Sequence, residues 1–125
     1  MNSGDTAQTA LTTEIMHRFN EVFQRHDPAA LAELVAEDCV IEGIQPTPNG
    51  ARYVGRDACV AQWKEIATAP GTHFDLEEVF VAGDRAIIRW RFWKGEGESN
   101  SVRGVNLMRV HGALIVEAMG YSKSN

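Results

Sequence analysis

The second half of the chain constrains the fold most strongly, because it reads as a run of strands with only short breaks between them. Strand-like segments cover residues 73–81, 86–94, 102–110 and 114–121. Glycine-containing pairs at 83–84 and 111–112 provide tight turns. Strands joined this closely pair antiparallel, so the segments predict a β-meander. The apolar alternation of the first segment slips near Glu77 and Glu78, which predicts a β-bulge there.

Helical periodicity marks the first half. A helix is predicted from about Thr12 to His26, where apolar residues recur at spacings of three and four. Asp27 can cap a second, short helix, and Pro28 suits the first position of that helix. The apolar stripe of the second helix consists of Leu31, Leu34 and Val35.

A third helix is predicted from Arg56 to Thr68, because the proline–glycine pair at 70–71 ends the periodic segment. Short strands at 39–42 and 52–54 lie between the second and third helices, on either side of a loop rich in proline. Helices first and strands last are typical of an α+β domain rather than of repeated βαβ units.

The length of the chain fits one domain. Its 125 residues are enough to bury roughly two-thirds of the surface of the unfolded chain. Residues 1–10 are small and polar and are expected to form a short N-terminal tail. Residues 11–125 are expected to form the single domain.

Charge and hydropathy exclude several classes of partner. The formal net charge of −5 comes from interspersed acids, and nucleic-acid phosphates need clustered Lys and Arg. No apolar stretch approaches the roughly 20 residues that span a bilayer. No nucleic-acid or membrane partner is therefore expected. The N-terminus lacks the pattern of a signal peptide, which predicts a cytoplasmic location.

The cysteines and histidines predict no metal or redox site. Cys39 and Cys59 stand in apolar contexts and are expected to be small buried thiols. The four histidines are scattered, and neither Cys-x-x-Cys nor His-Glu-x-x-His spacing is present. No metal and no cofactor are expected.

Three segments carry a resemblance to a known family. They are the helix-Asp-Pro-helix start around 27–28, Val-Gly-Arg-Asp-Ala at 54–58, and Arg-Gly-Val-Asn-Leu-Met-Arg-Val at 103–110. Together they resemble the SnoaL-like branch of the nuclear transport factor two-like superfamily, which also holds the ketosteroid isomerase-like proteins. The resemblance implies a cystatin-like cone, in which three helices wrap a curved antiparallel sheet around an internal pocket. It also implies a homodimer formed through the convex face of the sheet.

The fold hosts unrelated activities, so an activity has to be argued from site residues. Ketosteroid isomerases need a carboxylate base and two acidic donors in an apolar cavity. The resemblance places their tyrosine on Phe19, their base on Gly43 and their protonated aspartate on Asn106. Only Asn106 keeps a hydrogen-bond donor, so this chemistry is not expected.

Two other activities of the superfamily also lack their acids. In limonene epoxide hydrolases an arginine works with two aspartates, and the resemblance matches the arginine to Arg89. The two aspartates fall on Arg91 and near Gly120. Polyketide cyclases depend on a late acid in that same last strand, which is missing too. Without paired carboxylates, the chain cannot activate water in this way.

Two orientations of the segment 86–94 are open. Alternation places Arg89 and Arg91 on one face of the strand and Ile88, Trp90 and Phe92 on the other. Periodicity alone favours the apolar set as the core face, with solvated arginines. The resemblance instead turns the arginine face toward the pocket and leaves Trp90 and Phe92 for a dimer interface. We carry the second orientation forward.

The ligand-binding residues predicted on this basis are Phe19, Trp63, Arg89, Arg91, Asn106 and Met108. A buried guanidinium needs an anion, and the internal candidates are Glu42, Glu77 and Glu78. Failing those, Arg89 would hold the charge of a small, partly apolar acid or carbonyl compound. Asn106 would donate a hydrogen bond, and Trp63 and Met108 would pack the apolar part.

Three functions stay open at this point. The first is an isomerase-, cyclase- or hydrolase-like enzyme. The second is a non-catalytic ligand-binding protein, and the third is a dimerisation module. No catalytic residue is assigned, because the sequence shows no evident general base.

Overall fold

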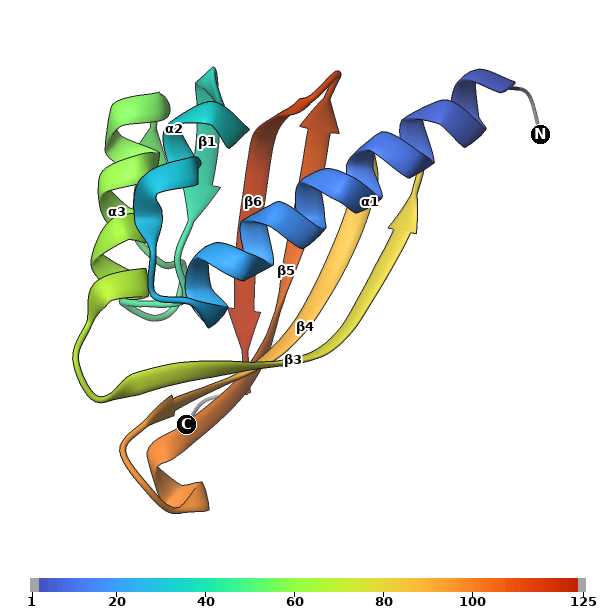
Figure 1. The fold of residues 1–125 in the computed structure, drawn as a ribbon. Coiled ribbons are helices and arrows are strands. Elements are labelled where there is room, and N and C mark those ends of the chain that lie inside the picture. The colour runs from blue at the N-terminus through green and yellow to red at the C-terminus, as the bar shows by residue number, and fades with distance from the viewer. Residues whose placement is uncertain (1–2, 124–125) are drawn as a thin grey trace.

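A computed structural model, which describes residues 3–123, has three helices packed on one face of a six-stranded sheet (Figure 1). The helices are α1 (Ser3–Gln24), α2 (Leu31–Leu34) and α3 (Arg56–Thr68), with short 3-10 turns at Pro28–Ala30 and Glu98–Asn100. The strands are β1 (Val35–Glu42), β2 (Arg52–Val54), β3 (Thr72–Ala82), β4 (Arg85–Lys94), β5 (Ser101–His111) and β6 (Leu114–Ser122). The predicted α+β cone with a curved sheet is confirmed.

The helix α1 is longer than its apolar stripe predicts. It begins at Ser3 rather than near Thr12, so residues 3–10 of the expected tail are helical, and residues 1 and 2 lie outside the described part. The predicted stripe itself is buried and consists of Ile15, Phe19, Val22 and Phe23. Packing of this stripe therefore accounts for the second half of α1 only.

Polar contacts hold the first half of α1 against the sheet. The Nε2 of Gln8 donates to the carbonyl oxygen of Gly112 over 3.2 Å. The hydroxyl oxygen of Thr9 accepts the N–H of Gly83 over 2.8 Å. Gly83 and Gly112 lie in the turns of two hairpins, so α1 reaches along the sheet as far as these turns (Figure 1).

The predicted cap at Asp27 is present, and its carboxylate accepts the N–H of Ala29 over 3.0 Å. The capped segment is a 3-10 turn followed by the single turn of α2, which ends at Leu34. Val35 is extended and already belongs to β1, so this strand begins four residues before the predicted Cys39.

The strand order in the sheet is β2-β1-β6-β5-β4-β3. Strands β3 to β6 form the predicted antiparallel meander. The pairing of β1 with β6 is parallel, which makes the sheet mixed. This pair is possible because the chain leaves β1, passes through β2 and α3, and builds the whole meander before it returns to β1.

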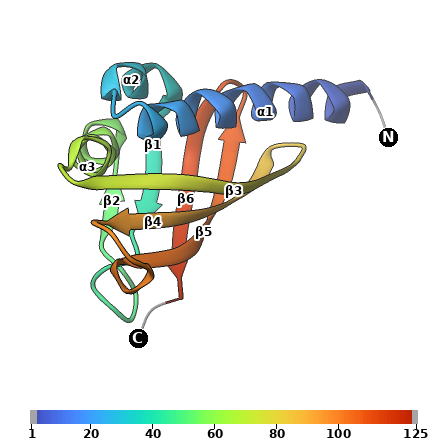
Figure 2. The same cartoon turned by 60° about the horizontal axis from the view of Figure 1, so that its bottom comes forward.

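The predicted bulge lies in β3. Leu76 pairs with Trp90 and Glu78 pairs with Arg89, so Glu77 is the extra residue. A bulge increases the bend and twist of a strand. The sheet is curved so strongly that β3 crosses β1 and β6 in the view of Figure 2.

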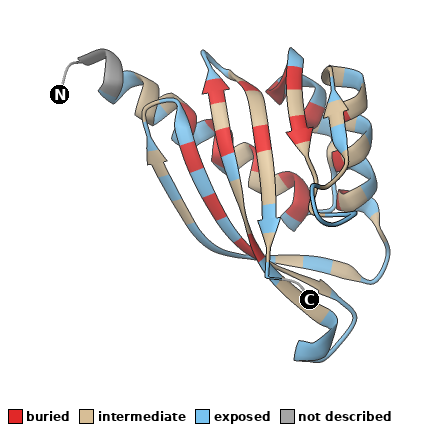
Figure 3. Cartoon of the chain, turned by 180° about the vertical axis from the view of Figure 1, so that it is seen from behind, coloured by how far each residue is buried: buried red, intermediate tan, exposed pale blue. Residues whose placement is uncertain are grey.

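The core lies between the helices and the concave face of the sheet. Buried positions recur along the central strands, as seen in Figure 3 from the side away from the helices. Fully buried side chains include Met16, Leu31, Leu34, Val110 and Ile115. Within residues 3–123, no helix has the length and apolar character needed to cross a bilayer.

Candidate functional site

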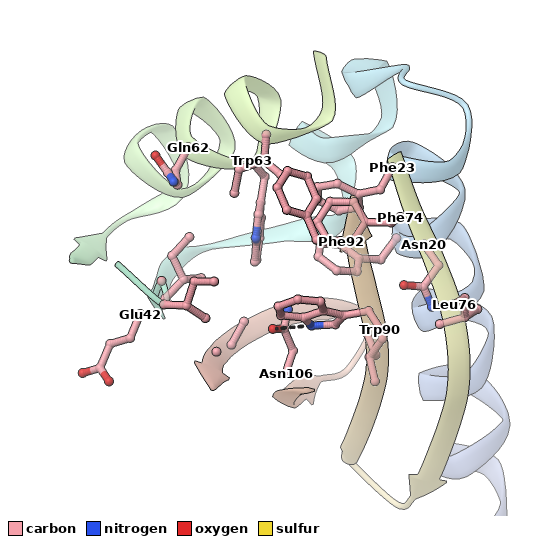
Figure 4. A pocket seen from close by; sticks show the side chains of 18 of the residues that line it. Asn20, Phe23, Glu42, Gln62, Trp63, Phe74, Leu76, Trp90, Phe92 and Asn106 are labelled. Atoms are coloured by element: carbon pink, nitrogen blue, oxygen red, sulfur yellow. Dashed lines mark hydrogen bonds between the residues drawn. The ribbon is translucent and has the colours of Figure 1, made fainter. Parts of the chain in front are cut away.

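A cavity of about 310 Å³ lies between the concave face of the sheet and the helices α1 and α3 (Figure 4). This volume is at the lower end of the range of small-molecule sites, roughly 300–1,000 Å³. Most of the wall is apolar, and its aromatic residues are Phe19, Phe23, Trp63, Phe74, Trp90 and Phe92.

The aromatic side chains form a continuous cluster. The ring centroid of Phe19 lies 5.0 Å from that of Phe23 and 4.8 Å from that of Trp63. The centroid of Phe74 lies 5.6 Å from those of Phe23 and Trp90. All four pairs meet edge to face, a geometry worth about 0.5–1.5 kcal/mol per pair beyond burial. The cluster therefore forms a well-packed apolar wall from helix to sheet.

Asn106 is held in place by Trp90. The indole Nε1 donates to the Oδ1 of Asn106 over 3.1 Å, which leaves the amide nitrogen as the group able to donate to a ligand. The indole has room because residue 104 is glycine. A Cβ at Gly104 would lie 2.5 Å from the Trp90 side chain and from the carbonyl oxygen of Tyr121.

Three of the six residues predicted to bind ligand lie on the cavity wall. They are Phe19, Trp63 and Asn106. Met108 is 1% exposed and packs in the core, behind the wall. That Phe19, Trp63 and Asn106 contact a ligand remains a prediction.

The predicted orientation of β4 is wrong. Ile88, Trp90 and Phe92 line the cavity, so Trp90 and Phe92 are not part of an outer interface. Arg89 and Arg91 lie on the opposite face of the sheet. An aromatic cavity offers no anion to a guanidinium, whereas the outer face exposes it to water.

Each arginine has its own surroundings on the outer face. Arg91 stacks over the ring of Trp93, with 4.4 Å between the guanidinium carbon and the ring centroid, and its Nε donates to the hydroxyl of Ser101 over 3.0 Å. Arg89 lines a shallow groove that also includes Arg103. Neither arginine contributes charge to the cavity, so the predicted salt bridge to a bound acid has no basis in the structure.

The sequence interpretation missed most of the helical wall. Asn20, Phe23 and Gln24 line the cavity together with Phe19. Phe23 lies one turn after Phe19 and shares its face of the helix, and Gln24 lies one turn after Asn20 on the flank of that face. Helical spacing from Phe19 could therefore have identified Phe23, whereas the two polar residues lie beside the apolar stripe.

The cavity is uncharged on its inner side. The only ionisable residues on its wall within the described part are Glu42 and Asp75. The carboxylate of Glu42 points away from the aromatic cluster (Figure 4) and pairs with Arg52 over 3.2 Å. The carboxylate of Asp75 accepts the indole N–H of Trp93 over 2.8 Å, on the outer face. Gly43, where the resemblance places an isomerase base, lines the cavity without a side chain.

Cys39 and Cys59 are free and buried, as predicted. Burial raises the pKa of the Cys39 thiol far above the ordinary value of 9.0, and the neighbouring Cys59 adds to the effect. Burial also raises the pKa of Cys59. Thiols held in the neutral form are poor nucleophiles. Across residues 3–123, no three His, Cys, Asp or Glu side chains are grouped so that they could hold a metal ion.

Comparison with protein families identifies the chain. The model of the SnoaL-like domain matches residues 16–118, which is most of the sequence. The chain belongs to the SnoaL-like family. No curated protein matches it.

Solved structures agree with this assignment. An NTF2-like protein of unknown function from Mesorhizobium loti is 67% identical to this SnoaL-like chain, with 94% of each chain covered and a TM-score of 0.89. A protein of unknown function with a cystatin-like fold from Methylobium petroleophilum is 14% identical, with a TM-score of 0.75 over 94% of this chain and 78% of the other. A steroid delta-isomerase from Pseudomonas aeruginosa is 15% identical, with a TM-score of 0.76 over 92% of this chain and 81% of the other.

The two distant structures show a shared fold and no more. Reaction type does not follow from a fold that hosts many functions. The function of this SnoaL-like chain has to be argued from the groups that face its cavity.

Proposed function

We propose that the cavity binds an uncharged, largely apolar small molecule, and that the chain acts as a ligand-binding protein without a general base. The observation that carries the proposal is the absence of any inward-facing ionic group on the described wall, because both wall carboxylates, of Glu42 and Asp75, are bonded outside. A charged ligand in this cavity would lose its hydration and gain no counter-ion, which costs several kcal/mol or more.

The polar groups of the wall are amides, and they suit a neutral ligand with a hydrogen-bond acceptor. Asn106 is the best placed of them, because its amide oxygen is already bonded to Trp90 and its nitrogen is left to donate. A ketone, ester or lactone oxygen fits this donor, and the aromatic cluster packs the rest of the molecule. Few polar contacts within a largely apolar cavity are typical of small-molecule sites.

An acid–base enzyme is the less supported alternative. Proton transfer needs a titratable group within hydrogen-bond reach of the substrate. The positions that would supply one by family resemblance hold Phe19, Gly43 and Asn106, none of which is titratable.

The test compares two probes of the same shape, neutral 2-acetylnaphthalene and anionic 2-naphthoate. Binding is measured by calorimetry and by the fluorescence of Trp63 and Trp90, which line the cavity. The ketone is expected to bind at least about tenfold more tightly, equivalent to about 1.4 kcal/mol. Arg89→Ala is expected to change neither affinity, because Arg89 lies on the outer face.

The opposite pattern would overturn the proposal. If naphthoate binds better and Arg89→Ala abolishes that binding, the anion site predicted from the sequence exists after all. If neither probe nor larger neutral ketones bind, the cavity is not a ligand site. Turnover with a pH profile that a wall substitution shifts would establish an acid–base enzyme instead.

The second candidate is a dimerisation module, because the outer face of the sheet carries exposed apolar side chains. Phe80, Ile87, Leu107 and Tyr121 are 61%, 43%, 39% and 57% exposed. We propose that this face pairs two copies of the chain. The role is compatible with ligand binding, since the cavity lies on the other side of the sheet.

A further inference from the structure

One hydrogen-bond donor on the cavity wall has no acceptor. Asn20 lies on α1, and its Nδ2 is buried without a hydrogen-bond partner among the described residues. Figure 4 shows the amide beside Leu76 and Trp90, two other residues of the wall. These neighbours present apolar surface and offer no acceptor, since the indole N–H of Trp90 is itself a donor and is used on Asn106.

The neighbouring amide on the same helical face shows the ordinary arrangement. The Nε2 of Gln24 donates to the carbonyl oxygen of Phe74 over 2.9 Å. Buried amide groups are bonded in the large majority of cases, and an unmet donor destabilises the folded state. A leucine at position 20 would have a similar size and no such cost. The unmet donor of Asn20 is therefore an unusual feature, and it belongs to a residue of the cavity wall.

We propose that Asn20 donates a hydrogen bond to the bound ligand. This inference rests on the proposed function and sharpens the class of ligand. Asn20 comes from α1 and Asn106 from β5, so the two donors approach the cavity from the helical wall and from the sheet. The ligand is then an uncharged molecule with acceptors at two separated positions, such as a diketone, a quinone or a keto-lactone.

The bond between Trp90 and Asn106 explains why an acceptor is selected at Asn106. The Oδ1 of Asn106 is occupied by the indole of Trp90. The side-chain nitrogen of Asn106 is left over, and with that of Asn20 it makes up the pair of donors that the proposed ligand would meet. Figure 4 shows the Asn20 oxygen on the cavity side and its nitrogen toward Leu76, so a bound acceptor would be met by rotation of the terminal amide torsion, which is broad for asparagine.

The test uses diacetylnaphthalenes that differ in the separation of their two carbonyl groups, with 2-acetylnaphthalene as the single-acceptor reference. In the wild-type protein, the diketone of matching separation is expected to bind at least about tenfold more tightly than the reference. In Asn20→Leu, this advantage is expected to vanish, which is measured as the ratio of the two affinities within the same variant. Asn100→Leu, which makes the same substitution at an exposed asparagine outside the cavity wall, is the control.

Asn20→Leu is also expected to raise the melting temperature of the unliganded protein by a few degrees, since it removes a buried unmet donor. This shift establishes that the variant folds, independently of any ligand.

Two results would overturn the inference and leave the proposed function intact. One is that no diketone binds better than the reference in the wild type. The other is that the diketone advantage persists in Asn20→Leu. If neither the diketones nor the reference binds the wild-type protein, the proposed function fails and the inference fails with it.

Discussion

Trp90 connects the groups that shape the cavity more than any other residue. Its ring packs edge to face on Phe74, its indole N–H fixes Asn106, and its six-membered ring fills the space above Gly104. It is 8% exposed, so nearly the whole side chain is committed to these contacts. Changes that displace this indole are therefore expected to alter both stability and ligand binding.

Gly104→Ala is the smallest change that displaces Trp90. The added methyl group would meet the Trp90 ring and the Tyr121 carbonyl oxygen at 2.5 Å, and the backbone atom cannot yield easily. Overpacking of this kind costs about 1–3 kcal/mol, and urea unfolding measures the loss. Gly43→Ala is the control, because its Cβ would find only ordinary contacts at 3.9 and 4.0 Å. Equal stability of the two variants would contradict the close packing of the Trp90 indole against Gly104.

The buried thiol of Cys39 predicts how stability depends on pH. Burial raises the pKa of Cys39 in the folded state above the value of 9.0 that an exposed thiol has. Above about pH 9 the unfolded chain loses this proton and the folded chain keeps it. The unfolded state is then favoured, and the free energy of unfolding falls by up to about 1.4 kcal/mol per pH unit for each such thiol.

Cys39→Ala tests this directly. Urea unfolding between pH 8 and pH 10.5 is expected to show a shallower decline for the variant than for the wild type, whatever the loss of stability at neutral pH. Below the unfolded-state pKa, the difference between the two proteins is expected to be constant. Parallel curves over the whole range would mean that the Cys39 thiol ionises equally in both states.

At the scale of the secondary structure elements, β4 shows what the sequence could and could not predict. The limits of β3 and β4 and the bulge at Glu77 were predictable, because alternation and turn residues are local signals. The inward face of β4 was only weakly marked, because both faces carry large apolar residues, with Ile87 and Trp93 opposite Ile88 and Trp90. The alternation of apolar residues alone favoured the correct face, but the orientation implied by the family resemblance was adopted instead.

The helical wall and the length of α1 show two further limits. Asn20 has no apolar character and lies about 100° around the helix from Phe19, so a search for a hydrophobic stripe passes over it. The first turns of α1 are held by side-chain bonds to hairpin turns that lie more than 70 residues away in sequence, as between Thr9 and Gly83. Contacts between residues so far apart in the sequence cannot be recognised from the apolar periodicity of the helix.

The contact between α1 and the β3–β4 turn predicts the effect of Thr9→Val. The substitution keeps the shape of the side chain and removes the oxygen that accepts the N–H of Gly83 over 2.8 Å. Loss of one such bond is expected to cost about 1 kcal/mol, and the Gly83 amide is expected to exchange its hydrogen faster. Thr13→Val is the control, because the Thr13 hydroxyl bonds only within α1. A similar effect of both substitutions would indicate a loss of helix propensity instead.

At the scale of the whole molecule, the two faces of the sheet differ in what covers them. The concave face is covered by helices and encloses the cavity. On the outer face, Phe80, Ile87, Leu107 and Met119 form one row across four strands, because they are consecutive cross-strand partners. Phe80, Ile87 and Leu107 are exposed and Met119 is partly buried, and a contiguous row of apolar side chains on a surface is typical of an interface between proteins.

Phe80→Glu tests whether this row pairs two chains. The side chain is 61% exposed, so the substitution leaves the core intact and places a charge in the proposed interface. Light scattering after size exclusion is expected to give about twice the chain mass of 13.8 kDa for the wild type and the single-chain mass for Phe80→Glu. Ala61→Glu adds the same charge at an exposed position of α3 and is expected to leave the dimer unchanged.

A wild-type protein of single-chain mass, or a Phe80→Glu variant that keeps the double mass, would show that the row does not join two chains. Because the cavity opens on the other side of the sheet, ligand affinity is expected to be the same in both forms.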